Sequence, residues 1–184
     1  MGSIENKKYI LKNGNEILIR NAVNDDAENI IEIKRSVVNE GVYMLRETDE
    51  AVYSTWKEIK VIEDHLHSNG SLYIVAESGN AIAGILEFQN GSLKRTSHAG
   101  MFTVYVAENF RNFGIGKFLI NELIFWAEKN PVIEKITLNV FSTNLRAIHL
   151  YKKCGFIIEG ICPKDMKLSD GTYIDSILMY KFVK

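Results

Sequence analysis

The chain has 184 residues but only two cysteines and two prolines. Cys154 and Cys162 have neither a CxxC partner nor a histidine at metal-ligand spacing, so nothing indicates a metal site. A disulfide would need an oxidising compartment, and nothing in the sequence indicates export. We therefore expect two free thiols in a reducing compartment and no bound metal.

The sequence also lacks an excess of charge of either sign. It carries 22 Lys and Arg against 23 Asp and Glu, a formal net charge of −1. The basic residues are scattered rather than gathered into a stripe, whereas nucleic-acid binding domains concentrate them on one face. We expect no nucleic-acid partner.

Long hydrophobic runs are missing as well. The longest, "FLINELIFWA", is interrupted by Asn121 and Glu122 and is too short to span a membrane. The first ten residues lack the apolar core of a signal peptide, and Asn6 stands where N-myristoylation needs Ser or Thr. We expect a cytoplasmic protein with no membrane partner.

No linker, low-complexity segment or internal repeat divides the chain, and 46% of its residues are hydrophobic. This favours one domain over residues 1–184, with residues 1–15 as an added N-terminal strand or extension. Alternation, turn and capping patterns predict the secondary structure. In chain order they give two strands around a turn at residues 13–15, a helix capped by Asn24 or Asp25, and a helix within 53–69. Three strands follow, within 71–77, 81–91 and 97–110. A helix after residue 116 and a strand at 134–141 come next. The last elements are a helix within 142–154, capped by Ser142 or Thr143, and strands at 155–161 and 172–183 around a loop.

This order predicts a mixed α/β fold around one sheet. The connection from the third strand of the meander to the strand at 134–141 passes through a helix, which predicts a parallel pair. The apolar residues of the strand at 97–110 run together, which is typical of a central strand covered on both faces.

The segment "RNFGIG", residues 111–116, precedes a helix. The first N–H groups of a helix have no intrahelical partner and carry partial positive charge. Gly114 and Gly116 lack the Cβ atoms that would hold a phosphate away, while Arg111 and Lys117 add full charges. The segment therefore suits a pyrophosphate. It is neither a P-loop nor a dinucleotide fingerprint, since Leu119 stands where a third glycine is needed, and a ligand-free glycine turn remains the alternative.

A second motif lies in "NLRAIHLYKKCGF". Asn144 and Tyr151 are seven residues apart, so both lie on one face of the predicted helix. Together with the glycine loop, this favours a pair of side chains that face a cofactor. The alternative is that neither residue faces a ligand. Asn144 would then be an ordinary residue of the first helical turn, and Tyr151 would lie at the edge of an amphipathic helix.

The loop, the helix motif and the order of elements together resemble the GCN5-related N-acetyltransferase (GNAT) superfamily. Its signature, Gln/Arg-x-x-Gly-x-Gly/Ala, matches residues 111–116, and the resemblance runs from about residue 16 to the C-terminus. It implies a mostly antiparallel central sheet, a splayed parallel pair and about four helices. It also implies acetyl-CoA as cofactor and direct acetyl transfer to an amine. The C-terminal "DGTYIDSILMY" resembles members that act on amino acids, including phosphinothricin-type enzymes.

The resemblance also assigns roles to residues. In this family the strand before the glycine loop holds the pantetheine arm, a role that falls on Val104, Tyr105 and Val106. Tyr151 is the candidate proton donor to the thiolate, and a backbone N–H, that of Val104, is the candidate oxyanion donor. The cofactor-binding residues implied are Val104, Tyr105, Val106, Arg111, Asn112, Phe113, Gly114, Ile115, Gly116, Lys117, Asn144 and Tyr151.

The sequence determines the general base and the acceptor-binding residues less fully than the cofactor-binding residues. Glu87 lies inside a strand, where a carboxylate faces either solvent or a site, and it is the candidate base. His98 acting through water is an alternative, while His65 and His67 are expected at the surface. Tyr43 and Arg46, with Glu87, are the candidate acceptor-binding residues, and Arg46 would hold a carboxylate.

The sequence thus predicts an acetyl-CoA-dependent N-acetyltransferase whose acceptor is a primary amine of a small molecule, such as an amino acid. Two alternatives remain. One is acetylation of a protein or peptide N-terminus, and the other is a non-catalytic CoA-binding sensor. Dimers are common in the superfamily, so a homodimer is possible.

Overall fold

The computed structural model describes residues 2–184, in which eight strands form one sheet in the order β1-β2-β3-β4-β5-β6-β8-β7. All neighbouring strands are antiparallel except β5 and β6, which are parallel as predicted. The strands are β1 (Lys7–Ile10), β2 (Glu16–Asn21), β3 (Leu72–Ser78), β4 (Ala81–Asn90), β5 (Ala99–Val106), β6 (Lys135–Phe141), β7 (Ile157–Lys167) and β8 (Tyr173–Phe182).

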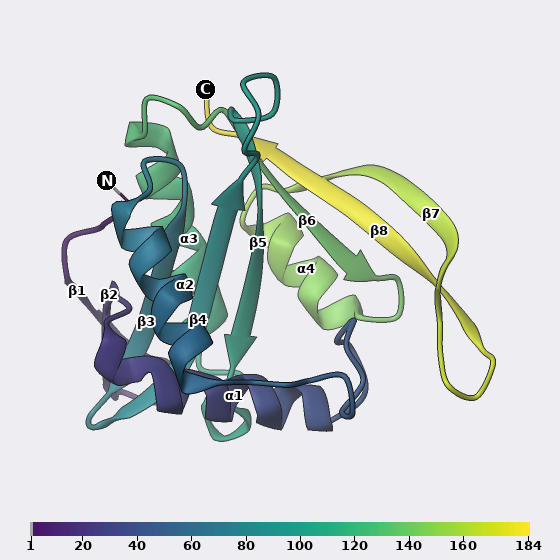
Figure 1. Ribbon diagram of the computed structural model, residues 1–184, viewed down its shortest axis with the longest axis horizontal. Helices are drawn as coiled ribbons and strands as arrows, with labels where there is room; N and C mark the ends of the chain where they lie inside the picture. The colour runs from purple at the N-terminus through teal and green to yellow at the C-terminus, as the bar shows by residue number, and fades with distance from the viewer. Residues whose placement is uncertain (1) are drawn as a thin grey trace.

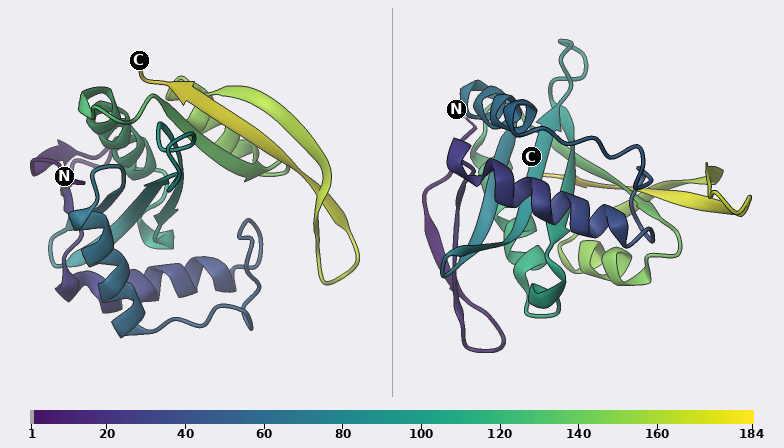
Figure 2. Two further views of the ribbon diagram at one scale, coloured as in Figure 1. Left: turned by 45° about the horizontal axis from the view of Figure 1, so that its top comes forward. Right: turned by 60° about the horizontal axis from the view of Figure 1, so that its bottom comes forward.

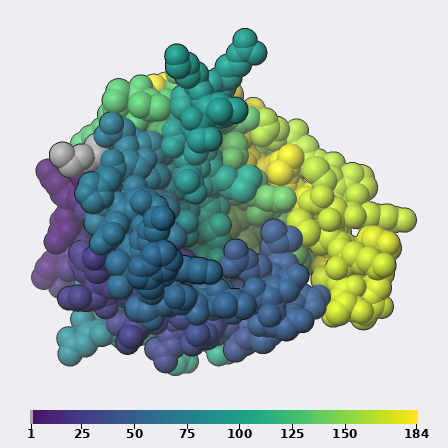
Figure 3. Space-filling model, viewed as in Figure 1, coloured from purple at the N-terminus to yellow at the C-terminus, as the bar shows by residue number. Residues whose placement is uncertain are grey.

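Within residues 2–184, four α-helices cover the two faces of this sheet, with α1 and α2 on one face and α3 and α4 on the other (Figures 1 and 2). Figure 3 shows that α1, α2 and the loop between them cover much of one side of the molecule. The helices are α1 (Ala27–Asn39), α2 (Thr55–His67), α3 (Ile115–Lys129) and α4 (Leu145–Lys153), and short 3₁₀ turns span Asn24–Asp26 and Glu108–Phe110. The order of elements is the one that the sequence predicts.

The feature that positions the site is the short pairing between β5 and β6. Only Ala99 to Met101 pair with β6, opposite Lys135 to Thr137. Beyond these residues the two strands diverge, while β5 stays paired with β4 as far as Val106 (Figure 1). One edge of β5 is therefore not hydrogen-bonded to a neighbouring strand over its second half.

This divergence also corrects one prediction. The continuous apolar run of β5 is not buried on both faces, since Met101 is 50% exposed and Thr103 is also exposed. Uninterrupted burial occurs instead in β3 and β4, whose runs from Leu72 and from Ile82 are covered on both faces. The apolar run marks a central strand, but its neighbour β6 moves away and leaves it open.

Two local predictions at the C-terminal end are also wrong. The helix α4 is capped by Asn144, whose Oδ1 accepts a hydrogen bond from Ala147 N at 3.1 Å, and not by Ser142 or Thr143. The predicted loop at 162–171 is largely strand, because β7 continues to Lys167 opposite β8. A register shift and a Lys164 φ of 53° interrupt the alternation there, and β7 and β8 extend as a long hairpin beyond the body (Figure 1).

Among residues 2–184, no helix combines the length and apolar character needed to cross a bilayer.

Candidate active site

A cavity of about 1340 Å³ extends along the diverging strands and reaches both faces of the sheet. On one face it is lined by the glycine loop and α4, including Gly116, Leu150 and Tyr151. On the other face it is lined by Glu58, Glu87 and the loop between α1 and α2. Two reactants can therefore enter from opposite faces and meet in the gap between β5 and β6.

The glycine loop has the geometry of an anion cradle. Gly114 adopts a φ of +102° at the N-cap of α3, a conformation that side-chain-bearing residues rarely adopt. The first intrahelical hydrogen bond runs from Phe118 N to Gly114 O, so the N–H groups of residues 115–117 have no intrahelical partner. A Cβ on Gly116 would lie 3.3 Å from Leu150 Cδ2, in the space between the helix start and α4. These residues fit the pyrophosphate of a coenzyme.

The open edge of β5 offers backbone groups to an extended ligand. Ala107 N donates to Ala83 O on β4, and Gly91 N donates to Ala99 O, so odd-numbered residues of β5 turn their backbone groups toward β4. Because backbone direction alternates along a strand, Val104 and Val106 point theirs into the gap. The Val106 carbonyl accepts from Arg111 Nε at 3.0 Å. Both the N–H and the C=O of Val104 therefore face the gap, whereas the backbone of Tyr105 is turned to β4.

Tyr151 lies at the α4 side of this gap. Its ring packs edge-on against Phe102, with centroids 5.8 Å apart, and against Phe156 at 6.2 Å. Burial raises the pKa of Tyr151 to about 12, and the nearby Cys154 thiol adds to the shift. The phenol is thus held protonated at neutral pH, as a proton donor must be.

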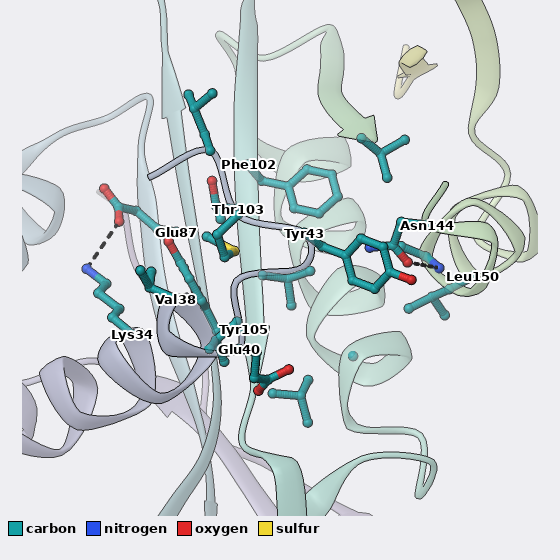
Figure 4. A pocket seen from close by; sticks show the side chains of 18 of the residues that line it. Lys34, Val38, Glu40, Tyr43, Glu87, Phe102, Thr103, Tyr105, Asn144 and Leu150 are labelled. Atoms are coloured by element: carbon teal, nitrogen blue, oxygen red, sulfur yellow. Dashed lines mark hydrogen bonds and ion pairs between the residues drawn. The ribbon is translucent and has the colours of Figure 1, made fainter. Parts of the chain in front are cut away.

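The structure also shows what the other predicted cofactor residues contact. Asn144 lines the cavity at the start of α4, and Figure 4 shows it across the pocket from Glu87. Arg111 pairs with Glu40, with Nη1 2.8 Å from Oε2, and this contact raises the pKa of the guanidinium. Asn112 has a φ of 71°, and Phe113 O accepts a hydrogen bond from Lys12 N.

Sequence reasoning missed several cations at this end of the cavity. They are exposed side chains from the segment after β1 and from the first and last turns of α4, and such a rim attracts a phosphate-bearing ligand. Arg146 and Lys153 are seven residues apart, like Asn144 and Tyr151, so the same helical spacing could have identified them. The additional cations are Lys12, Arg146 and Lys153.

On the opposite face, Glu87 points into the cavity (Figure 4). Its Oε2 lies 3.7 Å from Lys34 Nζ, and Lys34 in turn donates to Glu58 at 2.8 Å. Tyr73 Oη also donates to Glu58, at 2.6 Å. Lys34 and Glu58 are 8% and 6% exposed, so the carboxylate of Glu58 is neutralised while Glu87 remains the more accessible one.

The sequence carried a signal for this buried network. Glu58, Ile62 and His65 recur at the spacing of one helical face, as Ile30 and Lys34 do in α1. A charged residue at an apolar position indicates a buried polar contact, but its partner on another element is not visible in the sequence. His65 is 4% exposed, so its predicted surface position is wrong, whereas His67 is exposed.

The remaining candidates divide between the cavity and the surface. Tyr43 and Arg46 line the cavity from the loop after α1, and Figure 4 shows Tyr43 extending toward the α4 side. His98 is exposed before β5, at the paired end of the strand, and does not line the cavity. Glu87 therefore has a position in the site that His98 lacks.

Comparison with known proteins agrees with this geometry. Residues 39–156 match the acetyltransferase (GNAT) family. This chain belongs to the GNAT acetyltransferase family. The family uses acetyl-CoA, so the chain is an acetyl-CoA-dependent N-acetyltransferase whose cofactor suits the glycine loop and the open edge of β5.

Individual GNAT relatives cover between 71% and 91% of the chain. The L-amino acid N-acetyltransferase AaaT of Escherichia coli is 29% identical over 170 residues, 89% of this chain and 96% of AaaT. The spermidine N(1)-acetyltransferase of Vibrio cholerae is 26% identical over 71% of this chain and 75% of its own length. The crystal structure of a GNAT acetyltransferase from Streptococcus pneumoniae superposes with a TM-score of 0.86, at 27% identity, over 91% of this chain and 99% of that one.

Proposed function

We propose that this acetyltransferase acts on the primary amine of a small molecule that also carries a carboxylate, such as a free amino acid. The observation that carries the proposal is the charge of the acceptor side of the cavity. Arg46 and Lys57 line it, and within residues 2–184 neither forms an ion pair. The two unpaired cations suit the carboxylate of the substrate, and the carboxylate base Glu87 suits its amine.

The surroundings of the cavity support a small acceptor over a peptide. Residues 42–46 and 52–54 line the acceptor side, so the loop between α1 and α2 borders the entrance. The AaaT relative is named for L-amino acids, which agrees with the cations. The spermidine enzyme relative makes a polyamine the alternative, but a polyamine would meet Arg46 and Lys57 as like charges.

The residues can be given roles in the reaction. When bound, acetyl-CoA supplies an acetyl group activated as a thioester. Glu87 accepts a proton from the acceptor ammonium group, which frees the nitrogen lone pair for attack. The N–H of Val104 donates to the carbonyl oxygen as that oxygen gains negative charge. Tyr151 gives its proton to the departing sulfur and regains one from the nitrogen, which loses its second proton as the amide forms. Gly114, Gly116 and their neighbours hold the diphosphate.

The acceptor proposal is tested by thiol release across a panel of amino acids, polyamines and peptides with free N-termini. Arg46→Ala should raise KM for an amino acid at least tenfold and leave the Kd of acetyl-CoA unchanged, because one charge-assisted pair is lost. Arg95→Ala, at an exposed arginine outside the cavity, is the control. Turnover of polyamines alone, or an unchanged KM in Arg46→Ala, would contradict the proposal.

The role of Glu87 is tested separately. Glu87→Gln should lower kcat about 100-fold, within the usual range for loss of a general base. Glu159→Gln, at a strand carboxylate outside the cavity, is the control. A kcat for Glu87→Gln equal to that of wild type would remove Glu87 from the mechanism.

We also propose that the enzyme acts in the cytoplasm. Cys154 and Cys162 are both free thiols, which agrees with a reducing compartment. Fractionation of cells that produce the protein, followed by immunodetection, would test this.

A further inference from the structure

His65 carries an unpartnered nitrogen that points at the proposed base. It lies on α2, is 4% exposed, and its Nε2 lies 3.7 Å from Glu87 Oε1. Within residues 2–184, this Nε2 is the one buried side-chain nitrogen or oxygen without a hydrogen-bond partner. A buried polar atom without a partner is costly, so its retention here calls for a role.

The other ring nitrogen fixes the tautomer. His65 Nδ1 lies 2.7 Å from the carbonyl oxygen of Val61, which can only accept, so Nδ1 carries the hydrogen. In the neutral ring Nε2 is then a bare acceptor that faces a carboxylate oxygen, another acceptor. The two atoms attract one another only when a proton lies on one of them.

A second cavity of about 180 Å³ adjoins this pair. Glu87 and His65 both line it, together with Asp64, Ser68 and Ser71. Glu87 also lines the large cavity, so its carboxylate borders both spaces. Glu87 thus connects the acceptor side of the large cavity with a small polar pocket.

We propose that His65 is a proton relay that acts through Glu87. The acceptor ammonium transfers a proton to the Glu87 carboxylate. Protonated Glu87 then moves from 3.7 Å into hydrogen-bond range of His65 Nε2 and passes the proton to its lone pair. The carboxylate is regenerated, and the imidazolium later releases the same proton from Nε2 toward the second cavity and solvent. No bond other than N–H and O–H changes, and no further reactant is needed.

The charges around the pair allow this transfer. Lys34 lies near the other carboxylate oxygen of Glu87, Oε2, at 3.7 Å, and its charge is offset by Glu58 at 2.8 Å. The ring of Tyr73 packs against His65 with centroids 5.4 Å apart. The titratable and charged groups that face the pair are Lys34 of α1, Glu58 and Asp64 of α2, Tyr73 of β3 and Tyr105 of β5.

The test compares His65→Gln with His67→Gln, using the intact enzyme. Glutamine has a similar reach and can hydrogen-bond Glu87, but it cannot take up a proton. His67 makes the same Nδ1 contact, with Glu63 O at 2.8 Å, but is exposed, so His67→Gln is a matched control. We expect His65→Gln to lower kcat at least tenfold, to leave the Kd of acetyl-CoA unchanged, and to increase the solvent deuterium isotope effect on kcat.

A wild-type kcat and isotope effect in His65→Gln would overturn the relay. Glutamine can still position Glu87 through a hydrogen bond, so unchanged kinetics would mean that His65 only positions Glu87. The inference rests on the proposed role of Glu87, and Glu87→Gln separates the two. If Glu87→Gln is inactive and His65→Gln is fully active, only the relay fails. If Glu87→Gln is fully active, the proposed base is wrong, and the relay fails with it.

A second measurement keeps His65 in place, so it does not depend on whether His65→Gln folds. Between the wild-type protein and Glu87→Gln, the ¹⁵N signal of His65 Nε2 should move, while the signals of His67 stay in place. An unmoved Nε2 signal would show that the two groups share no proton and would overturn the relay.

Discussion

Arg111, at the entrance of the glycine loop, forms a bidentate ion pair with Glu40 at the end of α1. Its Nε also donates to the Val106 carbonyl at 3.0 Å, so the guanidinium is fixed from two sides. A residue expected to face a phosphate is thus partly neutralised by a carboxylate 71 positions away in the sequence.

This pairing predicts that Glu40→Gln strengthens acetyl-CoA binding. Removal of the carboxylate leaves the positive charge of Arg111 uncompensated near the pyrophosphate site, and we expect Kd to fall about two- to tenfold at low salt. Isothermal calorimetry at two salt concentrations measures the effect, which should shrink at the higher one. Glu108→Gln is the control, because the Glu108 carboxylate is close to Arg111 but forms no ion pair with the guanidinium, and only the Glu108 carbonyl accepts a hydrogen bond, from the Arg111 backbone N–H. Equal gains in both variants would show that only net charge matters.

The two glycines of the loop should respond differently to alanine. Gly114 has a φ of +102°, where a Cβ costs about 1–2 kcal/mol, so Gly114→Ala should lower stability and weaken binding of acetyl-CoA. Gly116 lies in the first turn of α3, where alanine favours the helix by about 0.5–1 kcal/mol.

We therefore expect Gly116→Ala to retain stability, with a small loss of affinity from the 3.3 Å contact with Leu150. Thermal unfolding and calorimetry of both variants provide the measurement. If Gly114→Ala behaved like Gly116→Ala, the left-handed conformation would not be what the site requires.

Tyr151→Phe should lower kcat about 100-fold and leave the Kd of acetyl-CoA within twofold of wild type. The ring packing against Phe102 and Phe156 is kept, and only the proton donor is removed. Stopped-flow measurement of acetyl transfer separates this step from product release. Tyr180→Phe, at a partly buried tyrosine outside the cavity, is the control. An unchanged rate of transfer would exclude Tyr151 as the acid.

Tyr151 should also contribute to stability at high pH. Its pKa is about 12 in the folded protein and about 10 in an unfolded chain. Since the folded state holds this proton more tightly, its contribution is complete below pH 10 and is lost as the pH rises from 10 to 12. Wild type should therefore lose more of its free energy of unfolding over this range than Tyr151→Phe does. Urea unfolding at pH 9, 10 and 11 measures the difference, and parallel curves for the two proteins would contradict it.

The sequence predicted the parts of the site that depend on residues close together in the chain. Gly114 and Gly116 bracket the start of a helix, and Asn144 and Tyr151 are related by helical spacing, so local geometry places all four. The parallel pairing of β5 and β6 follows in the same way from a strand, a helix and a strand in order.

The parts that were missed depend on contacts between distant residues. Lys34 and Glu58 are 24 positions apart, and each is buried only because the other neutralises it. His65 was expected at the surface, because its position close to the end of α2 does not reveal that β3 and β4 cover it. Likewise, β7 looked like a loop beyond Ile161, since its strand character comes from pairing with β8 and not from its own alternation.

The short pairing between β5 and β6 has a consequence for the resistance of the protein to proteolysis. A ligand that binds the native chain and not the unfolded one protects it by about 2.7 kcal/mol at a hundred times its Kd. Because coenzyme A would bridge two halves of the sheet whose strands pair at only three residues each, bound coenzyme should slow proteolysis of the protein.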